Sequence, residues 1–282
     1  MRIASTLLAC VILLGAAVGC AKTEAKAEEP APSSSPPPVK VCMVSASDEY
    51  ASNDELTEFQ KTLERRFNIV CTHAFGKEQN TELEGIEKLD SSDVMILYTR
   101  RSALSTEQLE HVRKFVAAGK GVVGIRTASH AFKGWPEFDK QVLGGNYMGH
   151  YGKGPATQIA IVEKAKGHPI LAGFTAYEST SWLYKNPGVV GGANNVEVLL
   201  TGTTKDITEP VAWTHEPATA GLRRGAQRVF YTSLGAHDDF ENEGFRQMLV
   251  NAVFWTAKRP VEAKPPEAVK SPADKAAAPA KK

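Results

Sequence analysis

The segments Asp93-Val94-Met95-Ile96-Leu97-Tyr98 and Gly121-Val122-Val123-Gly124-Ile125 decide the fold. Each is a short apolar run of the kind that predicts a strand buried on both faces of a sheet. Between them, Ser105-Thr106-Glu107-Gln108 is a capping box that opens a helix, and Gly119 ends that helix. A strand, a helix and a further strand in this order predict a right-handed crossover between parallel neighbours.

Strands and helices also alternate before this unit, but fewer helices separate the strands after it. Strands are predicted over residues 39–44 and 68–73, and a helix over 54–66 lies between them. Later strand-like runs, at 157–162, 196–200, 210–214 and 228–232, have few helices between them, and an amphipathic helix closes the pattern at 243–258. We therefore expect one α/β domain with an open, mostly parallel sheet and a β-rich second half.

Both ends of the 282-residue chain differ from this domain in composition. Residues 1–20 read as a signal peptide, and Ala16-Ala17-Val18-Gly19-Cys20 resembles a bacterial lipobox in which Cys20 becomes acylated. An ordinary secretory signal or a short anchor helix is the alternative. Residues 21–38 and 260–282, rich in Ala, Lys, Glu, Ser and Pro, predict an extended tether and tail. The expected protein is an exported, membrane-anchored lipoprotein facing the periplasm or cell surface, with its domain over 39–259.

Charge and cysteine content limit the partners and the chemistry. The net charge of +1, without long blocks of like charge, removes the composition argument for nucleic acid or a polybasic membrane surface and favours a small ligand. Oligomeric state is not readable from the sequence. Cys42 and Cys71 lie in predicted strands, where they pair if the strands are neighbours or otherwise remain buried thiols.

Polar residues follow several predicted strands, and ligands of open α/β sheets bind beyond the carboxyl ends of the strands. His130 and His237 are candidate general acids or bases, and Asp238 could orient His237. Arg126 could hold a carboxylate or a pair of hydroxyls. The structural alternatives are a histidine bonded to backbone at a helix start, a polar loop that caps the next helix, and an arginine that pairs with an acid of the fold.

The sequence lacks the motifs that mark a cysteine or serine nucleophile or a metal site. Arg126 stands directly after a buried strand, where amidotransferase-like folds carry a nucleophilic cysteine, and residues 124–128 do not match the G-x-S-x-G elbow. No cofactor is firmly implied. A divalent metal could be bound by His130, His150 and His237, although no H-E-x-x-H or C-x-x-C spacing supports it.

An ordered set of motifs resembles the ThuA-like (trehalose utilisation) family of the class I glutamine amidotransferase-like superfamily. These motifs are residues 124–130 (GIRTASH), 144–150 (GGNYMGH), His168-Pro169-Ile170, Tyr177-Glu178, Pro210-Val211-Ala212-Trp213, 228–235 (RVFYTSLG) and the helix over 245–255. The resemblance implies a flavodoxin-like sheet and an association with trehalose and related sugars. Two departures are Arg126, where the family often has histidine, and Ala236, inserted between Gly235 and His237.

Taken together, these features predict a protein that acts on a sugar or an oxidised (keto) sugar, as a hydrolase or lyase without amidotransferase chemistry. The alternative is a carbohydrate-binding or scaffold lipoprotein without turnover. Titratable groups at strand ends favour the enzyme, and the missing nucleophile and metal signatures favour the binding protein. The residues expected to contact the substrate are Tyr98, Arg100, His150, Tyr147, Glu178, Trp213 and His215.

Overall fold

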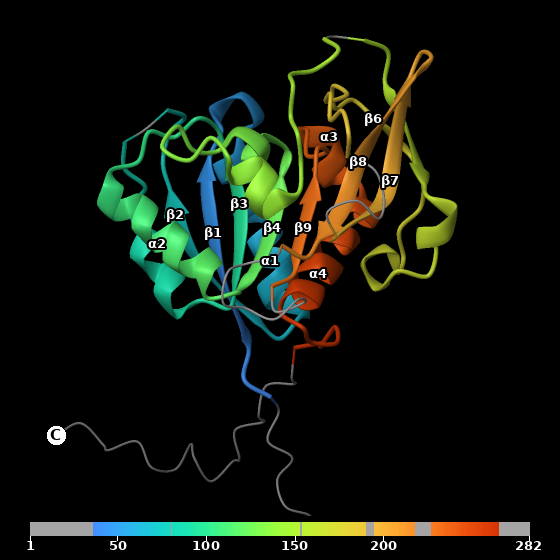
Figure 1. The fold of residues 1–282 in the computed structure, drawn as a ribbon. Helices are drawn as coiled ribbons and strands as arrows, with labels where there is room; N and C mark the ends of the chain where they lie inside the picture. Colours follow the sequence, from blue (N-terminus) through green and yellow to red (C-terminus); the bar gives the residue numbers. More distant parts are fainter. Residues whose placement is uncertain (1–35, 80, 153, 190–194, 218–226, 265–282) are drawn as a thin grey trace, which may run out of the picture. The chain divides into compact units, whose positions relative to one another are not determined.

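The computed structural model describes residues 36–264, except 80, 153, 190–194 and 218–226. Within these residues a nine-stranded sheet has the order β2-β1-β3-β4-β9-β8-β7-β5-β6 (Figure 1). None of the described helices is both long and apolar enough to cross a membrane. The predicted signal peptide with Cys20, most of the tether and most of the tail lie outside the described residues.

The first half of the sheet is parallel. Its strands are β1 (Val39–Ala46), β2 (Ile69–Phe75), β3 (Val94–Thr99), β4 (Gly121–Ile125) and β9 (Val229–Thr232). Every residue of β3, β4 and β9 is buried, as the apolar runs require for strands covered on both faces.

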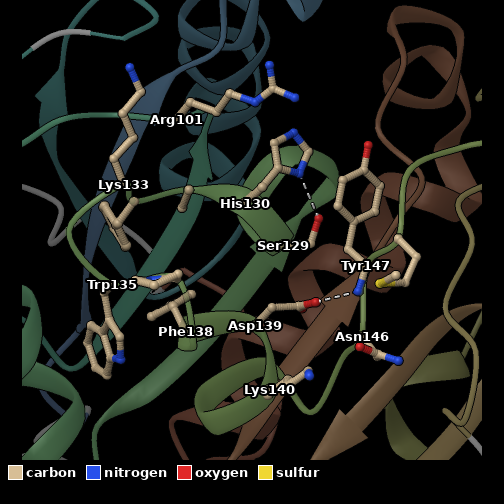
Figure 2. A pocket seen from close by; sticks show the side chains of 14 residues that line it. Arg101, Ser129, His130, Lys133, Trp135, Phe138, Asp139, Lys140, Asn146 and Tyr147 are labelled. Atoms are coloured by element: carbon tan, nitrogen blue, oxygen red, sulfur yellow. Dashed lines mark hydrogen bonds between the residues drawn. The ribbon is translucent and has the colours of Figure 1, made fainter.

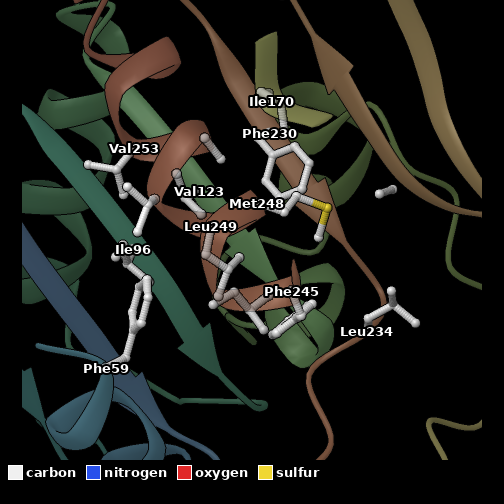
Figure 3. Close-up of a cluster of buried hydrophobic side chains, with 14 of the residues drawn as sticks. Phe59, Ile96, Val123, Ile170, Phe230, Leu234, Phe245, Met248, Leu249 and Val253 are labelled. Carbon is white, nitrogen blue, oxygen red and sulfur yellow. The ribbon is translucent and has the colours of Figure 1, made fainter. Parts of the chain in front are cut away.

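Helices cover both faces of this parallel half. On one face, α1 (Ser52–Arg66), α3 (His237–Glu241) and α4 (Glu243–Thr256) supply Phe59, Phe240 and Met248 to an apolar cluster, part of which Figure 3 shows. On the other face, α2 (Thr106–Ala117) packs Val112 and Phe115 into a second cluster. Short helical turns complete the domain: η1 (Asp48–Tyr50), η2 (Ile86–Ser91), η3 (Arg126–His130), the π-helical η4 (Asp139–Leu143), η5 (Glu163–Ala165) and η6 (Pro169–Leu171).

The second half of the sheet is antiparallel. It comprises β8 (Ile207–His215), β7 (Val196–Thr204), β5 (Thr157–Ile161) and the short edge strand β6 (Glu178–Ser179). Because β8 runs against β9, the carboxyl end of β8 lies beside the beginning of β9, where His215 pairs with Val229. The mixed α/β sheet, first parallel and then antiparallel, agrees with the predicted fold class.

The two cysteines of the domain lie in neighbouring strands and are both free thiols. In the β1–β2 register Cys71 is opposite Val41, so Cys42 is offset by one residue. Adjacent residues of a strand point to opposite faces. Cys42 therefore joins the cluster beneath α2, whereas Cys71 packs against the cluster beneath α1 and α4, and the pairing that the sequence left open does not form.

The two ends of the described chain meet at the amino edge of the parallel strands. Asn68 Nδ2 donates to the Pro36 carbonyl at 2.8 Å, and the Asn68 backbone N–H donates to the Glu262 carbonyl at 2.9 Å. The backbone N–H of Lys264 donates to the Arg66 carbonyl at 2.9 Å. Residues 36–38 and 260–264, which composition assigns to the tether and tail, are thus hydrogen-bonded to the domain.

Candidate functional site

A pocket of about 510 Å³ opens beyond the carboxyl ends of β3 and β4 (Figure 2). Its volume lies in the range of small-molecule sites. Three segments build its wall: the turn after β3, the chain from η3 to η4, and the loop that follows η4. The lining residues are Arg101, Ser129, His130, Ala131, Phe132, Lys133, Trp135, Pro136, Phe138, Asp139, Lys140, Asn146, Tyr147 and Met148.

Backbone hydrogen bonds hold the first two of these segments together. The Arg101 N–H donates to the His130 carbonyl at 2.9 Å, and the Ser102 N–H donates to the Ala131 carbonyl at 2.7 Å. The Lys133 N–H in turn donates to the Ser102 carbonyl at 2.9 Å. The turn after β3 and the chain after β4 therefore form one continuous rim, which explains why Arg101 and His130 share a pocket although they are far apart in the sequence.

Arg126 is the first residue after β4 and has a left-handed backbone, with φ of 46°. Its guanidinium is buried: Nη1 donates to the Ser233 carbonyl at 2.7 Å and Nη2 to the Tyr50 hydroxyl at 3.2 Å. The rings of Tyr50 and Tyr184 lie 4.5 and 4.9 Å from the guanidinium carbon. Arg126 thus ties the loops after β4 and β9 together and does not line the pocket, and its Nε is buried without a hydrogen-bond partner among the described residues.

His130 ends η3 and faces the pocket. Its Nδ1 lies 3.0 Å from the Ser129 hydroxyl, which itself donates to the Arg126 carbonyl at 3.3 Å. Since that hydroxyl has a single proton, we assign Nδ1 as the donor to Ser129, and Nε2 then carries the lone pair. Burial, with the positive charges of Arg101, Arg100 and Arg126, lowers the pKa of His130 to about 3. The imidazole is therefore neutral at physiological pH, with the lone pair of Nε2 free, and it is a weaker base than an ordinary histidine.

Asp139 was not a predicted site residue, yet its buried side chain shapes the pocket. Its Oδ2 accepts a hydrogen bond from the backbone N–H of Tyr147 at 2.7 Å and so holds the loop after η4, while Oδ1 is buried and no described residue donates a hydrogen bond to it. Burial raises the pKa of Asp139 to about 6. A Cβ on Gly145 would lie 2.2 Å from Oδ1, so the glycine is what lets the carboxyl approach the loop.

Aromatic rings form one wall of the pocket. The Tyr147 ring stacks on His130 with centroids 4.5 Å apart, and Tyr184 lies against Tyr147 at the same distance. Trp135 is held edge-on to Phe138, with Arg113 over its ring at 4.4 Å. Of the predicted site residues, His130 and Tyr147 line this pocket.

His237 lies apart from His130. Its exposed ring at the start of α3 contacts Glu55 of α1 at 2.5 Å and Glu241 at 3.6 Å. The hydrogen bond to Glu55 raises the pKa of His237. Asp238 is exposed on the same helix, whereas Asp239 is buried and accepts the N–H groups of Gly235 and Ala236 at 2.7 and 2.9 Å. The expectation that His130 and His237 face a common cleft is not met, because His237 faces α1 and does not line the pocket.

Four further residues predicted to contact the substrate lie outside the lining of this pocket. The Trp213 ring is fully buried and its Nε1 donates to the Leu143 carbonyl at 2.7 Å, so no sugar can stack on it. Tyr98 is fully buried and donates to the Gly235 carbonyl at 2.6 Å. His215 is buried at the opposite end of the sheet and bonds the Val142 carbonyl at 2.8 Å. Glu178 lies on the edge strand β6, where it accepts a hydrogen bond from Gln158.

The remaining two predicted contacts are near the rim but outside the pocket lining. Arg100 pairs with Glu78 and, at 3.5 Å, with Glu49. His150 lies in the loop after η4 and packs against Trp182 with ring centroids 4.8 Å apart. In the described part of the chain, no three His, Cys, Asp or Glu side chains are grouped closely enough to hold a metal ion, so His130, His150 and His237 do not form such a group here.

The missed lining residues Lys133, Trp135, Asp139 and Asn146 share one sequence feature. They lie between the strand ending at Ile125 and the next strand at Thr157, in a segment with neither helical nor strand periodicity. A long irregular segment after a central strand of an α/β sheet is itself a sign of function.

The fold and the pocket define an α/β protein with a mixed sheet and a pocket at the carboxyl edge of its parallel strands. The family model for ThuA, described as trehalose utilisation, matches residues 40–256, and the chain belongs to this family.

Solved structures share the fold. A ThuA-like protein from Bacteroides uniformis is 18% identical with a TM-score of 0.58, over 81% of this chain and 95% of that one. A ThuA-like protein from Parabacteroides merdae is 17% identical with a TM-score of 0.57, over 82% of this chain and 94% of that one. A comparison with curated proteins gives no match.

Proposed function

We propose that this protein acts on a sugar or an oxidised (keto) sugar in the utilisation of trehalose or a related disaccharide, with His130 as general base. The family match supports a role related to trehalose utilisation. The observation that carries the proposal is a neutral, oriented imidazole in a pocket of a size suited to a sugar.

The chemistry follows from what Nε2 of His130 can do. On a keto sugar it takes the proton from the carbon beside the carbonyl, and the electron pair of that C–H bond forms a C=C bond. The bond from the next carbon to the glycosidic oxygen breaks, and that oxygen leaves with its electron pair and takes a proton from water. This elimination needs no cysteine or serine nucleophile, in agreement with the missing nucleophile after β4.

Other lining residues would orient the substrate. Arg101, Asn146 and the Tyr147 hydroxyl offer hydrogen bonds to sugar oxygens, and Trp135 adds apolar surface. Arg126 acts indirectly and does not contact the substrate. Its charge favours the neutral form of His130, and its hydrogen bonds to Ser233 and Tyr50 hold the loop after β4 in place.

The test is a screen of monosaccharides and disaccharides, including keto sugars, for binding and for conversion, with metal content measured on the same sample. His130→Gln should lower turnover at least a hundredfold while leaving the melting temperature and sugar binding near wild type. His111→Gln, which removes a histidine on α2 paired with Asp90, serves as the matched control. Full turnover in His130→Gln would refute the assignment of the base. Binding by the wild type without conversion would instead establish a non-catalytic carbohydrate-binding protein.

We further propose that the chain is exported and anchored through acylated Cys20. The lipobox-like sequence and the tether composition support this. Cys20→Ser should move the protein from the membrane fraction to the soluble fraction of a bacterial host, and mass spectrometry should find the acyl mass only on the wild type. An unacylated wild-type protein in the soluble fraction would refute the proposal.

The sheet order also supports a flavodoxin-like ancestry for the parallel half, as in the class I glutamine amidotransferase-like superfamily. Strands β2-β1-β3-β4-β9 follow the 2-1-3-4-5 order of that fold, with the pocket beyond the carboxyl ends of its central strands.

A further inference from the structure

Three positively charged side chains in the pocket wall have no acidic partner within the described ranges. Arg101, Lys133 and Lys140 are exposed and belong to different parts of its wall, and within the described residues none of the three forms an ion pair. In Figure 2, Arg101 and Lys133 extend past His130 toward the same side of the view, whereas Lys140 lies below Asp139. The acidic lining residue, Asp139, is buried and turned toward the backbone of Tyr147.

Arg100, the neighbour of Arg101 in the turn after β3, is neutralised by acidic residues. Arg100 pairs with both Glu78 and Glu49, whereas Arg101, the next residue, has no acidic partner in the part of the chain that the structure describes. The backbone of Arg101 is nevertheless held beside His130, because its N–H donates to the His130 carbonyl, and its φ is 51°. The side chain of Arg101 therefore starts from the rim that carries the proposed base, and its charge acts on His130.

We infer that the pocket binds a sugar carrying an acidic group, a carboxylate or a phosphate ester, whose anionic oxygens contact Arg101 and Lys133. A guanidinium presents a planar fork of N–H donors that matches either group, and an ammonium adds a second charge from another direction. This inference rests on the proposed function, since it names the class of sugar that the same pocket takes.

A bound anion would also affect the base. The charges of Arg101 and Arg100 contribute to the low pKa of His130. A negative group placed beside Arg101 offsets that effect, so His130 becomes a stronger base when an acidic sugar is bound. A neutral sugar would leave the basicity of His130 nearly unchanged.

Calorimetric titration of the protein with three probes tests the inference: glucose, glucuronate and glucose 6-phosphate. At least one acidic probe should bind roughly tenfold or more tightly than glucose at low salt, and the advantage should shrink several-fold at 300 mM salt. The tighter of the two acidic probes identifies the preferred group. Arg101→Gln and Lys133→Gln should each remove most of the advantage, while Lys164→Gln, an exposed lysine outside the pocket on η5, should leave it intact.

Nuclear magnetic resonance of the His130 ring supplies an independent readout. The acidic probe that binds should raise the pKa of His130 by at least one unit, and glucose should not. Equal binding of all three probes, or an advantage that survives both pocket substitutions, would overturn the inference and leave the proposed sugar chemistry standing. Failure of every sugar, neutral or acidic, to bind would overturn both. Tight binding of an acidic probe that both pocket substitutions weaken would support the inference, whereas turnover is tested separately on keto sugars, because none of the three probes has a glycosidic bond beside a keto group.

Discussion

The low pKa of His130 makes a specific prediction about the dependence of turnover on pH. A base with the ordinary pKa near 6.5 would lose about nine-tenths of its active form at pH 5.5. His130, with a pKa of about 3, stays neutral, so kcat/KM, which reports the free enzyme, should be flat from pH 8 to pH 5. Initial rates in overlapping buffers measure this. A fall in kcat/KM centred between pH 6 and 7 would contradict the assigned environment of the imidazole.

Asp139 should make the domain less stable as its carboxyl ionises. Its pKa is about 6 in the folded protein and near 3.8 in the unfolded chain, so the folded state holds its proton more tightly. Stability from this group is therefore full below pH 3.8 and is lost as the pH rises through 6. The free energy of unfolding of Asp139→Asn minus that of wild type should increase by about 2 kcal/mol as the pH rises from 4 to 8. Urea titrations at several pH values measure this difference. A difference that does not change with pH would refute the raised pKa.

At this scale the sequence predicted His130 and Tyr147 as pocket residues but not their neighbours. The rule that ligands bind beyond strand ends located His130, because it needs only the end of one strand. Trp213 looked like a sugar contact, but its position in a strand does not say which side of the sheet is covered, and it is buried. Asp139 could not be assigned because its role depends on a hydrogen bond to a loop eight residues away.

At the scale of elements, strand direction decides which end of a strand reaches the site. An apolar run predicts a strand without its direction, so His215, at the end of β8, was grouped with residues that follow parallel strands. The antiparallel pairing of β8 with β9 places it at the other end of the sheet. Similarly, His237 follows β9 at the correct edge, but the helix it begins packs against α1.

The loop after η4 depends on Gly145, which gives a prediction for this element. An alanine Cβ would lie 2.2 Å from Oδ1 and 2.8 Å from Cγ of Asp139, and that buried carboxyl has little room to move. Gly145→Ala should lower the free energy of unfolding by about 1 to 3 kcal/mol and displace Tyr147, weakening sugar binding. Gly167→Ala, where a Cβ would meet nothing within 4 Å, is the control. Unchanged stability and binding in Gly145→Ala would show that the loop does not rely on this contact.

At the scale of the whole molecule, periodicity predicted the parallel half and its covering helices because each unit is local in sequence. The order of the sheet could not be obtained in the same way, since β9 inserts between β4 and β8 after more than a hundred intervening residues. Composition assigned residues 36–38 and 260–264 to the tether and tail, yet these segments hydrogen-bond to the domain, because a polar segment that binds the domain surface has the same composition as a free tail.

The terminal segments should therefore contribute to stability. A chain of residues 39–259 loses the Asn68 bonds to Pro36 and Glu262, and the 2.6 Å bond from Arg259 Nη1 to the Pro37 carbonyl. Asn68 is 8% exposed, so its freed polar groups lack full access to water. Relative to residues 36–264, the shorter chain should lose roughly 2 kcal/mol, or about 4 to 8 °C in melting temperature by calorimetry. Extending 36–264 to residue 282 is the control and should change the melting temperature by less than about 1 °C. Equal melting of the short and longer chains would mean that the domain ends where composition alone places it.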